Sequence, residues 1–154
     1  MTPVSVTSAQ ATRTLALPAL SDCHARIEAW LASPFVPPVD KTEILALLDK
    51  GEGSVEELRD RFYRELEFGT GGLRGITGAG NNRMNAPVLR RCTQGLANFI
   101  LKNGTEAARR GVAIAYDSRV RSREFALEAA CVLGANGIRT FVFDEVQTTP
   151  CLSF

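Results

Sequence analysis

The stretch Glu67–Asn85, EFGTGGLRGITGAGNNRMN, combines six glycines with two arginines and has no apolar periodicity. Glycine backbone turns easily toward a bound anion because glycine has no Cβ. Thr70 adds a hydroxyl, and Arg74 adds a planar guanidinium whose N–H groups match the oxygens of a phosphate. On these residues alone, a phosphate-binding loop and a plain tight connection are equally good interpretations.

This stretch lacks both common nucleotide-binding motifs. A dinucleotide fingerprint needs glycine at the position that Arg74 occupies, and it follows a strand, whereas this stretch follows an expected helix. The G-K-[ST] of a P-loop is also missing. What remains is a loop whose glycines, Gly71 and Gly72 among them, can aim backbone amides at an anion.

A second group of charged residues lies where a strand is expected to end. Asp117 ends the apolar run GVAIAYD, and Arg119, Arg121 and Arg123 follow it at alternate positions. In open parallel sheets, ligands bind at the carboxyl ends of the strands. Three guanidiniums at such an edge suit a phosphate, but a solvated basic edge, or salt bridges to Glu124 and Glu128, explains each of them at least as well.

Two amphipathic helices precede the glycine-rich stretch. DKTEILALLDKG begins with the capping-box pair Asp40 and Glu43, and SVEELRDRFYRELEF repeats the pattern with Ser54 and Glu57. Their apolar stripes predict a helical scaffold over residues 21–66.

In the second half of the chain, the spacing of apolar residues changes from a helical period to continuous apolar runs. GVAIAYD and IRTFVFD are continuous apolar runs of strand length, and the helical pattern SREFALEAACVLGANG separates them. This order predicts two parallel strands joined by a helix, in an α/β domain over residues 67–154. A further helix after Pro87 is expected to turn Leu96 and Phe99 toward the core. We expect residues 1–20 to form a loose tail.

Composition excludes several classes of function. The formal net charge of +1 over 154 residues lacks the basic field of a nucleic-acid-binding protein. The four cysteines lie singly, without C-x-x-C spacing, and His24 is the only histidine. We therefore expect buried, reduced thiols and no metal site in this chain. No apolar run approaches the roughly 20 residues needed to cross a bilayer, so no membrane contact is expected.

The glycine-rich stretch resembles the F-G-T-x-G-x-R-G signature of the α-D-phosphohexomutase superfamily. VAIAYDSRVRSREFA is similar to the superfamily's strand-D-x-R-x-S-x-x-F-A segment, GIRTFVFD to its next strand, and TTPCLSF to the Thr-Pro turn that follows. The blocks GAGNNRMN and TQGLANFI resemble the phosphoglucomutase and phosphopentomutase branch. The resemblance covers about residues 30–154, in the correct order.

This resemblance implies a three-layer α/β/α first domain with a mixed, mainly parallel sheet that is incomplete at its C-terminal end. It also implies a cytoplasmic enzyme that moves phosphate between the 1-position and the 6- or 5-position of a sugar, through a phosphoserine and a bisphosphorylated sugar. Mg²⁺ and glucose 1,6-bisphosphate are the implied cofactors. Arg74 is implied to contact the phosphoserine and the transferring group, and Thr70, Gly71 and Gly72 to bind phosphate beside it.

The sequence departs from the superfamily at its end. The phosphoserine loop, T-x-S-H-N-P, is expected after Phe154, and neither Ser118, Ser122 nor Ser153 stands at its position. The aspartates that hold magnesium belong to the second domain. We therefore expect an inactive N-terminal portion whose partners are a sugar phosphate and domains II to IV of the same chain. The alternative is a free-standing, non-catalytic phosphate-binding or regulatory module.

Overall fold

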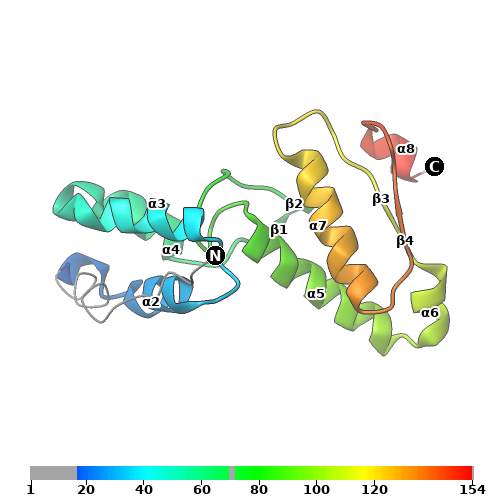
Figure 1. Ribbon diagram of the computed structural model, residues 1–154, viewed down its shortest axis with the longest axis horizontal. Coiled ribbons are helices and arrows are strands. Elements are labelled where there is room, and N and C mark those ends of the chain that lie inside the picture. The colour runs from blue at the N-terminus through cyan, green and yellow to red at the C-terminus, as the bar shows by residue number, and fades with distance from the viewer. Residues whose placement is uncertain (1–16, 70–71, 154) are drawn as a thin grey trace. The chain divides into compact units, whose positions relative to one another are not determined.

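The computed structural model describes residues 17–69 and 72–153 (Figure 1). The chain divides into two compact units, Met1–Asn85 and Ala86–Phe154, and each is described by itself below. The glycine-rich stretch belongs to the first unit, together with the helices that precede it. The domain boundary expected between residues 66 and 67 stays a prediction.

The first unit is built from short helices. They are η1 (Pro18–Leu20), α2 (His24–Ala32), α3 (Pro38–Asp49), η2 (Gly51–Ser54) and α4 (Val55–Phe62). Ile27 of α2, Ile44 of α3 and Leu58 of α4 are fully buried, as the apolar stripes predict. The rings of Trp30 and Phe62 meet edge to face with their centroids 5.9 Å apart, which joins α2 to α4.

Both predicted capping boxes are wrong. α3 begins at Pro38, and its N-cap residue Pro37 makes no side-chain cap bond. A proline at the first position has no N–H to satisfy, so this helix needs less capping. Ser54 does stand at the N-cap of α4, but its hydroxyl donates to the carbonyl oxygens of Leu47 and Gly51. Glu43 and the acidic residue of the second box have other partners, described below.

A small hairpin follows α4. Strand β1 (Phe68–Gly69) pairs antiparallel with β2 (Gly72–Leu73). Further along, Thr77 forms an isolated parallel bridge with Met84, and the N–H of Met84 donates to the carbonyl oxygen of Ile76. The chain between these bridge residues is therefore a closed loop that begins just after the hairpin.

The second unit contains the predicted strand, helix, strand order. Its elements are α5 (Ala86–Lys102), α6 (Thr105–Arg110), β3 (Val112–Ile114), α7 (Ser122–Ala135), β4 (Thr140–Val142) and α8 (Thr149–Ser153). β3 and β4 are parallel, with Ala113 opposite Phe141. Asn136 ends α7 and Gly137 follows with φ 72°, as the sequence predicts. The α/β class is confirmed.

Helices cover one face of this sheet. Ala97, Ala108, Leu133 and Ile138 form the core, and Val112 and Ile114 pack against it from β3. α5 and α7 lie side by side in this layer (Figure 1). On the other face Phe141 is 53% exposed. The described residues therefore supply a helical layer for one side of the sheet, as in an incomplete α/β domain.

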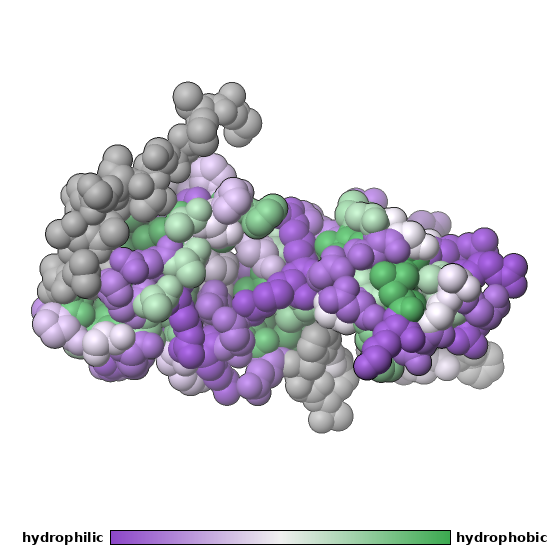
Figure 2. All heavy atoms as spheres, turned by 90° about the horizontal axis from the view of Figure 1, so that it is seen from below, coloured by the Kyte–Doolittle hydropathy of each residue, from purple (hydrophilic) through white to green (hydrophobic). Residues whose placement is uncertain are grey.

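The predicted inward face of α5 is partly wrong. Leu96 and Phe99 are exposed, whereas Thr93 and Ala97 are buried. Ala97 lies in the core cluster with Leu133 of α7, so the buried face of α5 is the one turned toward α7. On the face drawn in Figure 2, hydrophilic residues surround several separate hydrophobic patches.

The cysteines are also less buried than predicted. All four are free thiols; Cys23 is buried, but Cys131 and Cys151 are exposed. Burial raises the pKa of Cys23 and of Cys92, which keeps these two thiols protonated. Among the described helices, none is long and apolar enough to cross a membrane.

Candidate functional site

Two of the residues that the sequence singles out lie at the two ends of strand β2. Gly72 opens β2 with φ 119°, a backbone conformation that L side chains rarely adopt. Arg74 follows β2 directly, is exposed, and makes no hydrogen bond or ion pair with the residues that the structure describes. Thr70 and Gly71 lie outside the described residues, and their predicted roles stay predictions.

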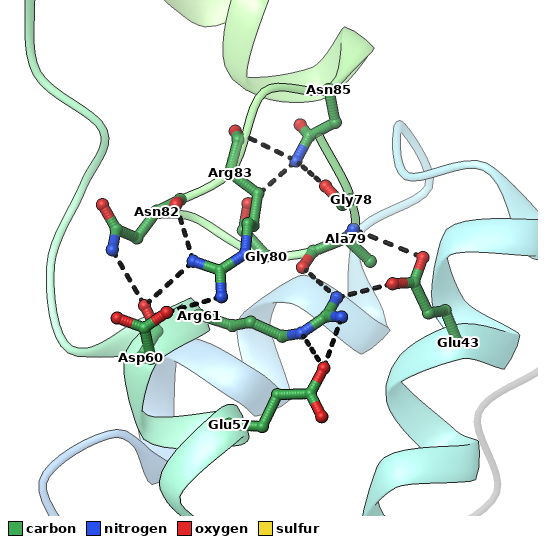
Figure 3. Close-up of polar contacts among 10 residues, drawn as sticks. All are labelled: Glu43, Glu57, Asp60, Arg61, Gly78, Ala79, Gly80, Asn82, Arg83 and Asn85. Carbon is green, nitrogen blue, oxygen red and sulfur yellow. Dashed lines mark hydrogen bonds and ion pairs between the residues drawn. The ribbon is translucent and has the colours of Figure 1, made fainter. Parts of the chain in front are cut away.

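A set of polar contacts fixes the end of the glycine-rich stretch (Figure 3). Arg61 of α4, with its side chain only 11% exposed, is the centre of these contacts. Its Nη1 donates to Glu43 Oε1 at 2.6 Å and to the carbonyl oxygen of Ala79 at 2.9 Å. Its Nε and Nη2 both donate to Glu57 Oε1, at 3.2 and 2.7 Å. Glu43 Oε2 in turn accepts the N–H of Ala79 at 3.4 Å.

The protonation of Arg61 is fixed by these partners. Burial alone would lower the pKa of the guanidinium, but the hydrogen bonds to Glu57 and Glu43 outweigh it, and the pKa is raised. A permanently charged side chain with paired carboxylates is an anchor, and it has no role in proton transfer. Neither oxygen of Glu43 is free to bind a further cation.

A second arginine closes the other side of the loop. Arg83 is buried, and its Nη2 donates to Asp60 Oδ2 at 2.6 Å. Asn82 Nδ2 donates to the carbonyl oxygen of Asp60 at 2.8 Å, and the N–H of Asn82 donates to the carbonyl oxygen of Arg61 at 2.9 Å. The loop is therefore tied to the last turn of α4 through main chain and side chains together.

The buried side chain of Asn85 forms hydrogen bonds with the backbone of the loop. The side chain is 2% exposed, and Nδ2 donates to the carbonyl oxygens of Gly78 and Gly80, each at 2.8 Å. Buried carbonyl groups that lacked these donors would cost free energy. We name Glu43, Asp60, Arg61, Asn82, Arg83 and Asn85 the anchoring cluster.

The arginines after β3 make their own local contacts in the second unit. Arg119 lies 3.4 Å from Asp117 Oδ2, and its N–H donates to Asp117 Oδ1 at 3.0 Å. That backbone hydrogen bond, with one from Ser122, lowers the pKa of Asp117. Arg121 adopts a left-handed conformation with φ 66° and stacks over the ring of Phe125, 4.9 Å from its centroid.

This edge is therefore partly neutralised. The salt bridge that was expected from this edge to Glu128 is absent among the described residues, because Glu128 pairs with Arg90 of α5 through two hydrogen bonds of 2.7 and 2.8 Å. Arg123 is exposed. An open hollow of about 420 Å³, lined in part by Arg109 and Arg139, lies at the opposite, amino ends of the strands and does not extend this edge.

The described part of the chain contains no group of three or more His, Cys, Asp or Glu side chains that could hold a metal ion. The magnesium implied by the sequence resemblance therefore does not fit the described residues.

Comparison with known proteins agrees with the α/β class. The family described as "Phosphoglucomutase/phosphomannomutase, alpha/beta/alpha domain I" matches residues 65–154. The chain belongs to this family, and that match covers both the glycine-rich stretch and the strand, helix, strand unit.

Curated relatives point the same way. A human protein named phosphopentomutase is 36% identical over 109 residues, which cover 67% of this chain and 18% of that protein. A probable phosphoribomutase of Schizosaccharomyces pombe is 37% identical over 63% of this chain and 16% of its own length. A phosphoglucomutase of Staphylococcus saprophyticus is 39% identical over 64% of this chain and 17% of its own length. The chain thus spans less than a fifth of these relatives. No solved structure matches it.

The anchoring cluster was not predicted from the sequence. The residues of α3 and α4 were assigned to a scaffold, and Glu43 and Glu57 to capping boxes. One local signal was present, because Glu57 and Arg61 stand four residues apart on one helix and form an ion pair. The polar run NNRMN, which has no apolar period, was a second signal for a loop with many internal hydrogen bonds.

Proposed function

We propose that this chain is the N-terminal portion of a sugar phosphomutase, in which the loop around Arg74 binds the phosphoryl group that is transferred. The observation that supports the proposal is the contrast between Arg74 and its neighbours. Arg61 and Arg83 are buried and paired with carboxylates, whereas Arg74 is exposed and has no partner among the described residues. An arginine left unpaired beside a positive-φ glycine suits an anion.

The proposed reaction interconverts a hexose 1-phosphate and 6-phosphate, or a pentose 1-phosphate and 5-phosphate. The curated relatives are named for glucose, pentose and ribose phosphates, so the proposal extends to both classes of substrate. Phosphoryl transfer spreads negative charge over the transferring oxygens, and a fixed guanidinium stabilises that charge. Arg74 and the backbone amides near Gly72 would supply this stabilisation.

Other parts of the reaction are proposed to lie outside the residues in hand. The phosphoserine and the magnesium ligands are assigned to the remainder of a longer protein, with glucose 1,6-bisphosphate as its activating intermediate. A cytoplasmic location is also proposed, because its reducing conditions would keep the four free thiols reduced.

The test is a titration of the isotope-labelled chain with glucose 1-phosphate, followed by NMR at the Arg74 Nε–H and at the Gly72 amide. We expect saturable chemical-shift changes at both positions with glucose 1-phosphate and none with unphosphorylated glucose. In Arg74→Ala, the Gly72 amide should show no change with glucose 1-phosphate. Shifts that occur equally with glucose, or that persist at Gly72 in Arg74→Ala, would contradict the assignment of Arg74 to the phosphate.

A second measurement separates the enzyme from a non-catalytic phosphate-binding module. The protein encoded by the complete gene is assayed for conversion of glucose 1-phosphate and of ribose 1-phosphate, with magnesium and the corresponding bisphosphate present. Turnover of either substrate supports the mutase. Phosphate binding without turnover of either would favour the module.

A further inference from the structure

We infer that Glu43 and Arg61 are positioning residues, which act through the loop Gly78–Asn85 to hold Arg74 in place for a phosphoryl group. The inference rests on the proposed function, because it assumes that Arg74 is the residue that meets phosphate. It assigns a functional part to helices α3 and α4, which lie before residue 65, where the family match begins.

Glu43 and Arg61 hold the loop at the backbone of Ala79. Both polar atoms of its backbone are bound by this pair of side chains, since the carbonyl oxygen accepts from Arg61 and the N–H donates to Glu43 (Figure 3). Arg61 also uses its own carbonyl oxygen to accept the N–H of Asn82. One residue of α4 thus holds the loop at two points, three residues apart.

Backbone hydrogen bonds connect the loop to the residues that follow Arg74. Met84 donates to the carbonyl oxygen of Ile76, and Gly78 donates to the carbonyl oxygen of Met84, so the loop is closed two residues after Arg74. Gly75, the residue next to Arg74, packs on Leu66, where an added Cβ would lie 2.9 Å from Cδ1. The N–H of Leu66 donates to the carbonyl oxygen of Asn81. The loop therefore fixes the backbone that follows Arg74, at Ile76 directly and at Gly75 through Leu66.

The loop needs this support because its own chain offers little. Gly78 and Gly80 have φ of 153° and 123°, and glycine loses more conformational entropy on ordering than other residues do. A guanidinium accelerates phosphoryl transfer only when it is already in position before the charge develops. The ion pairs of Arg61 and Arg83, whose side chains are 11% and 7% exposed, supply that order.

The two carboxylates that bind Arg61 provide a matched pair of variants. Glu43 uses both oxygens, one for Arg61 and one for the N–H of Ala79, so a glutamine there turns its NH₂ toward a donor. Glu57 uses only Oε1, so a glutamine there keeps the acceptor that Arg61 needs. Glu43→Gln therefore breaks the link to the loop, and Glu57→Gln removes the same charge without breaking it.

The experiment uses the labelled chain and three readouts: amide hydrogen exchange at Gly78, Ala79 and Met84, backbone order parameters from Leu73 to Ile76, and shifts at Arg74 Nε–H on titration with inorganic phosphate. In Glu43→Gln we expect exchange at Gly78 and Ala79 about 10-fold faster, which corresponds to the loss of one charged hydrogen bond. We also expect lower order parameters and weaker phosphate binding. In Glu57→Gln each readout should stay near that of the unsubstituted chain.

If Glu43→Gln does not fold well enough to be measured, Asp60→Ala is the second variant. Asp60 is half exposed, and its truncation takes the carboxylate away from buried Arg83, which keeps its hydrogen bonds to the carbonyl oxygens of Asp60 and Asn82. We again expect faster amide exchange at Gly78 and lower order parameters up to Ile76. Melting temperatures of all variants provide the check on folding.

The outcomes for the two proposals are distinct. If Glu43→Gln and Glu57→Gln have equal exchange rates and order parameters, the positioning role is overturned, whatever the phosphate titration gives. If the loop loosens only in Glu43→Gln but the unsubstituted chain shows no phosphate shift at Arg74, the link from helix to loop stands and the proposed phosphate site fails. If phosphate binds equally to both variants while the loop loosens, the anchoring is structural only, and the inference is overturned.

Discussion

The carbonyl oxygen of Arg61 lies 2.8 Å from the point that a Cβ on Gly80 would occupy, and Gly80 has φ 123°. No side chain fits at this position without moving the end of α4. We expect Gly80→Ala to lower the free energy of unfolding by about 2 kcal/mol, from strain and lost contacts together. Urea unfolding followed by circular dichroism measures it.

Gly53 is the matched control for that substitution. It lies in the same unit, and an added Cβ meets nothing within 4 Å. Gly53→Ala should leave stability unchanged, or raise it by about 0.5 kcal/mol through lower unfolded-state entropy. Equal destabilisation by both substitutions would show that close approach to Arg61 is not the cause.

Arg74→Ala should separate turnover from stability in the proposed mutase. The side chain is exposed and has no partner among the described residues, so its removal should leave the melting temperature unchanged. Loss of a fixed donor to a transferring group should lower kcat by about 100-fold to 1000-fold. Arg110→Ala, on the exposed end of α6, is the control and should leave kcat unchanged. Full activity in Arg74→Ala would remove this arginine from the reaction.

The residues 1–154 by themselves should show no mutase turnover. No serine in this sequence stands in a T-x-S-H-N-P motif, and covalent phosphoryl transfer needs an activated nucleophile. The chain is incubated with glucose 1-phosphate, glucose 1,6-bisphosphate and magnesium, then assayed for glucose 6-phosphate and for a mass increase from bound phosphate. A phosphate mapped to Ser118, Ser122 or Ser153 would contradict this expectation.

The pair Arg90 and Glu128 should make stability depend on pH. The hydrogen bond from Arg90 holds the pKa of Glu128 below its ordinary value of 4.5. A lowered folded-state pKa stabilises the protein above the unfolded-state pKa, and this contribution disappears as the pH falls through the folded-state pKa. Because both side chains are about one third exposed or more, we expect a contribution of at most about 1 kcal/mol.

The measurement compares the unsubstituted chain with Glu128→Gln in urea at pH 7 and at pH 3. The difference in unfolding free energy should be present at pH 7 and smaller at pH 3. Glu106→Gln is the control, because Glu106 pairs with Arg109 in a largely exposed i,i+3 contact. A difference that persists unchanged at pH 3 would rule out the ion pair as its origin.

Local patterns in the sequence predicted the elements well. The apolar stripe of Val55, Leu58 and Phe62 predicts a helix with one buried face, and all three are buried. The two apolar runs around SREFALEAACVLGANG predict parallel strands, which β3 and β4 form. Both features depend on residues close together in the sequence, where a period of two or 3.6 is enough evidence.

The anchoring cluster depends instead on residues far apart. Arg61 and Ala79 are 18 residues apart, and Glu43 and Ala79 are 36 apart. No periodicity links such partners, and a carboxylate near a helix start is as well explained by a capping box. The same limit applies to α5, where the buried Ala97 and the exposed Phe99 depend on packing against residues of α7 that lie far away in the sequence.

The contacts of Arg61 also bear on where this protein can be divided. The match to the domain I family begins at residue 65, whereas the side chains that hold Gly78–Asn85 come from residues 43 to 61. A recombinant piece that starts at residue 65 would keep the whole domain I match and yet leave Arg83 and Asn82 without Asp60. Truncation at that limit should give a protein with a poorly ordered loop.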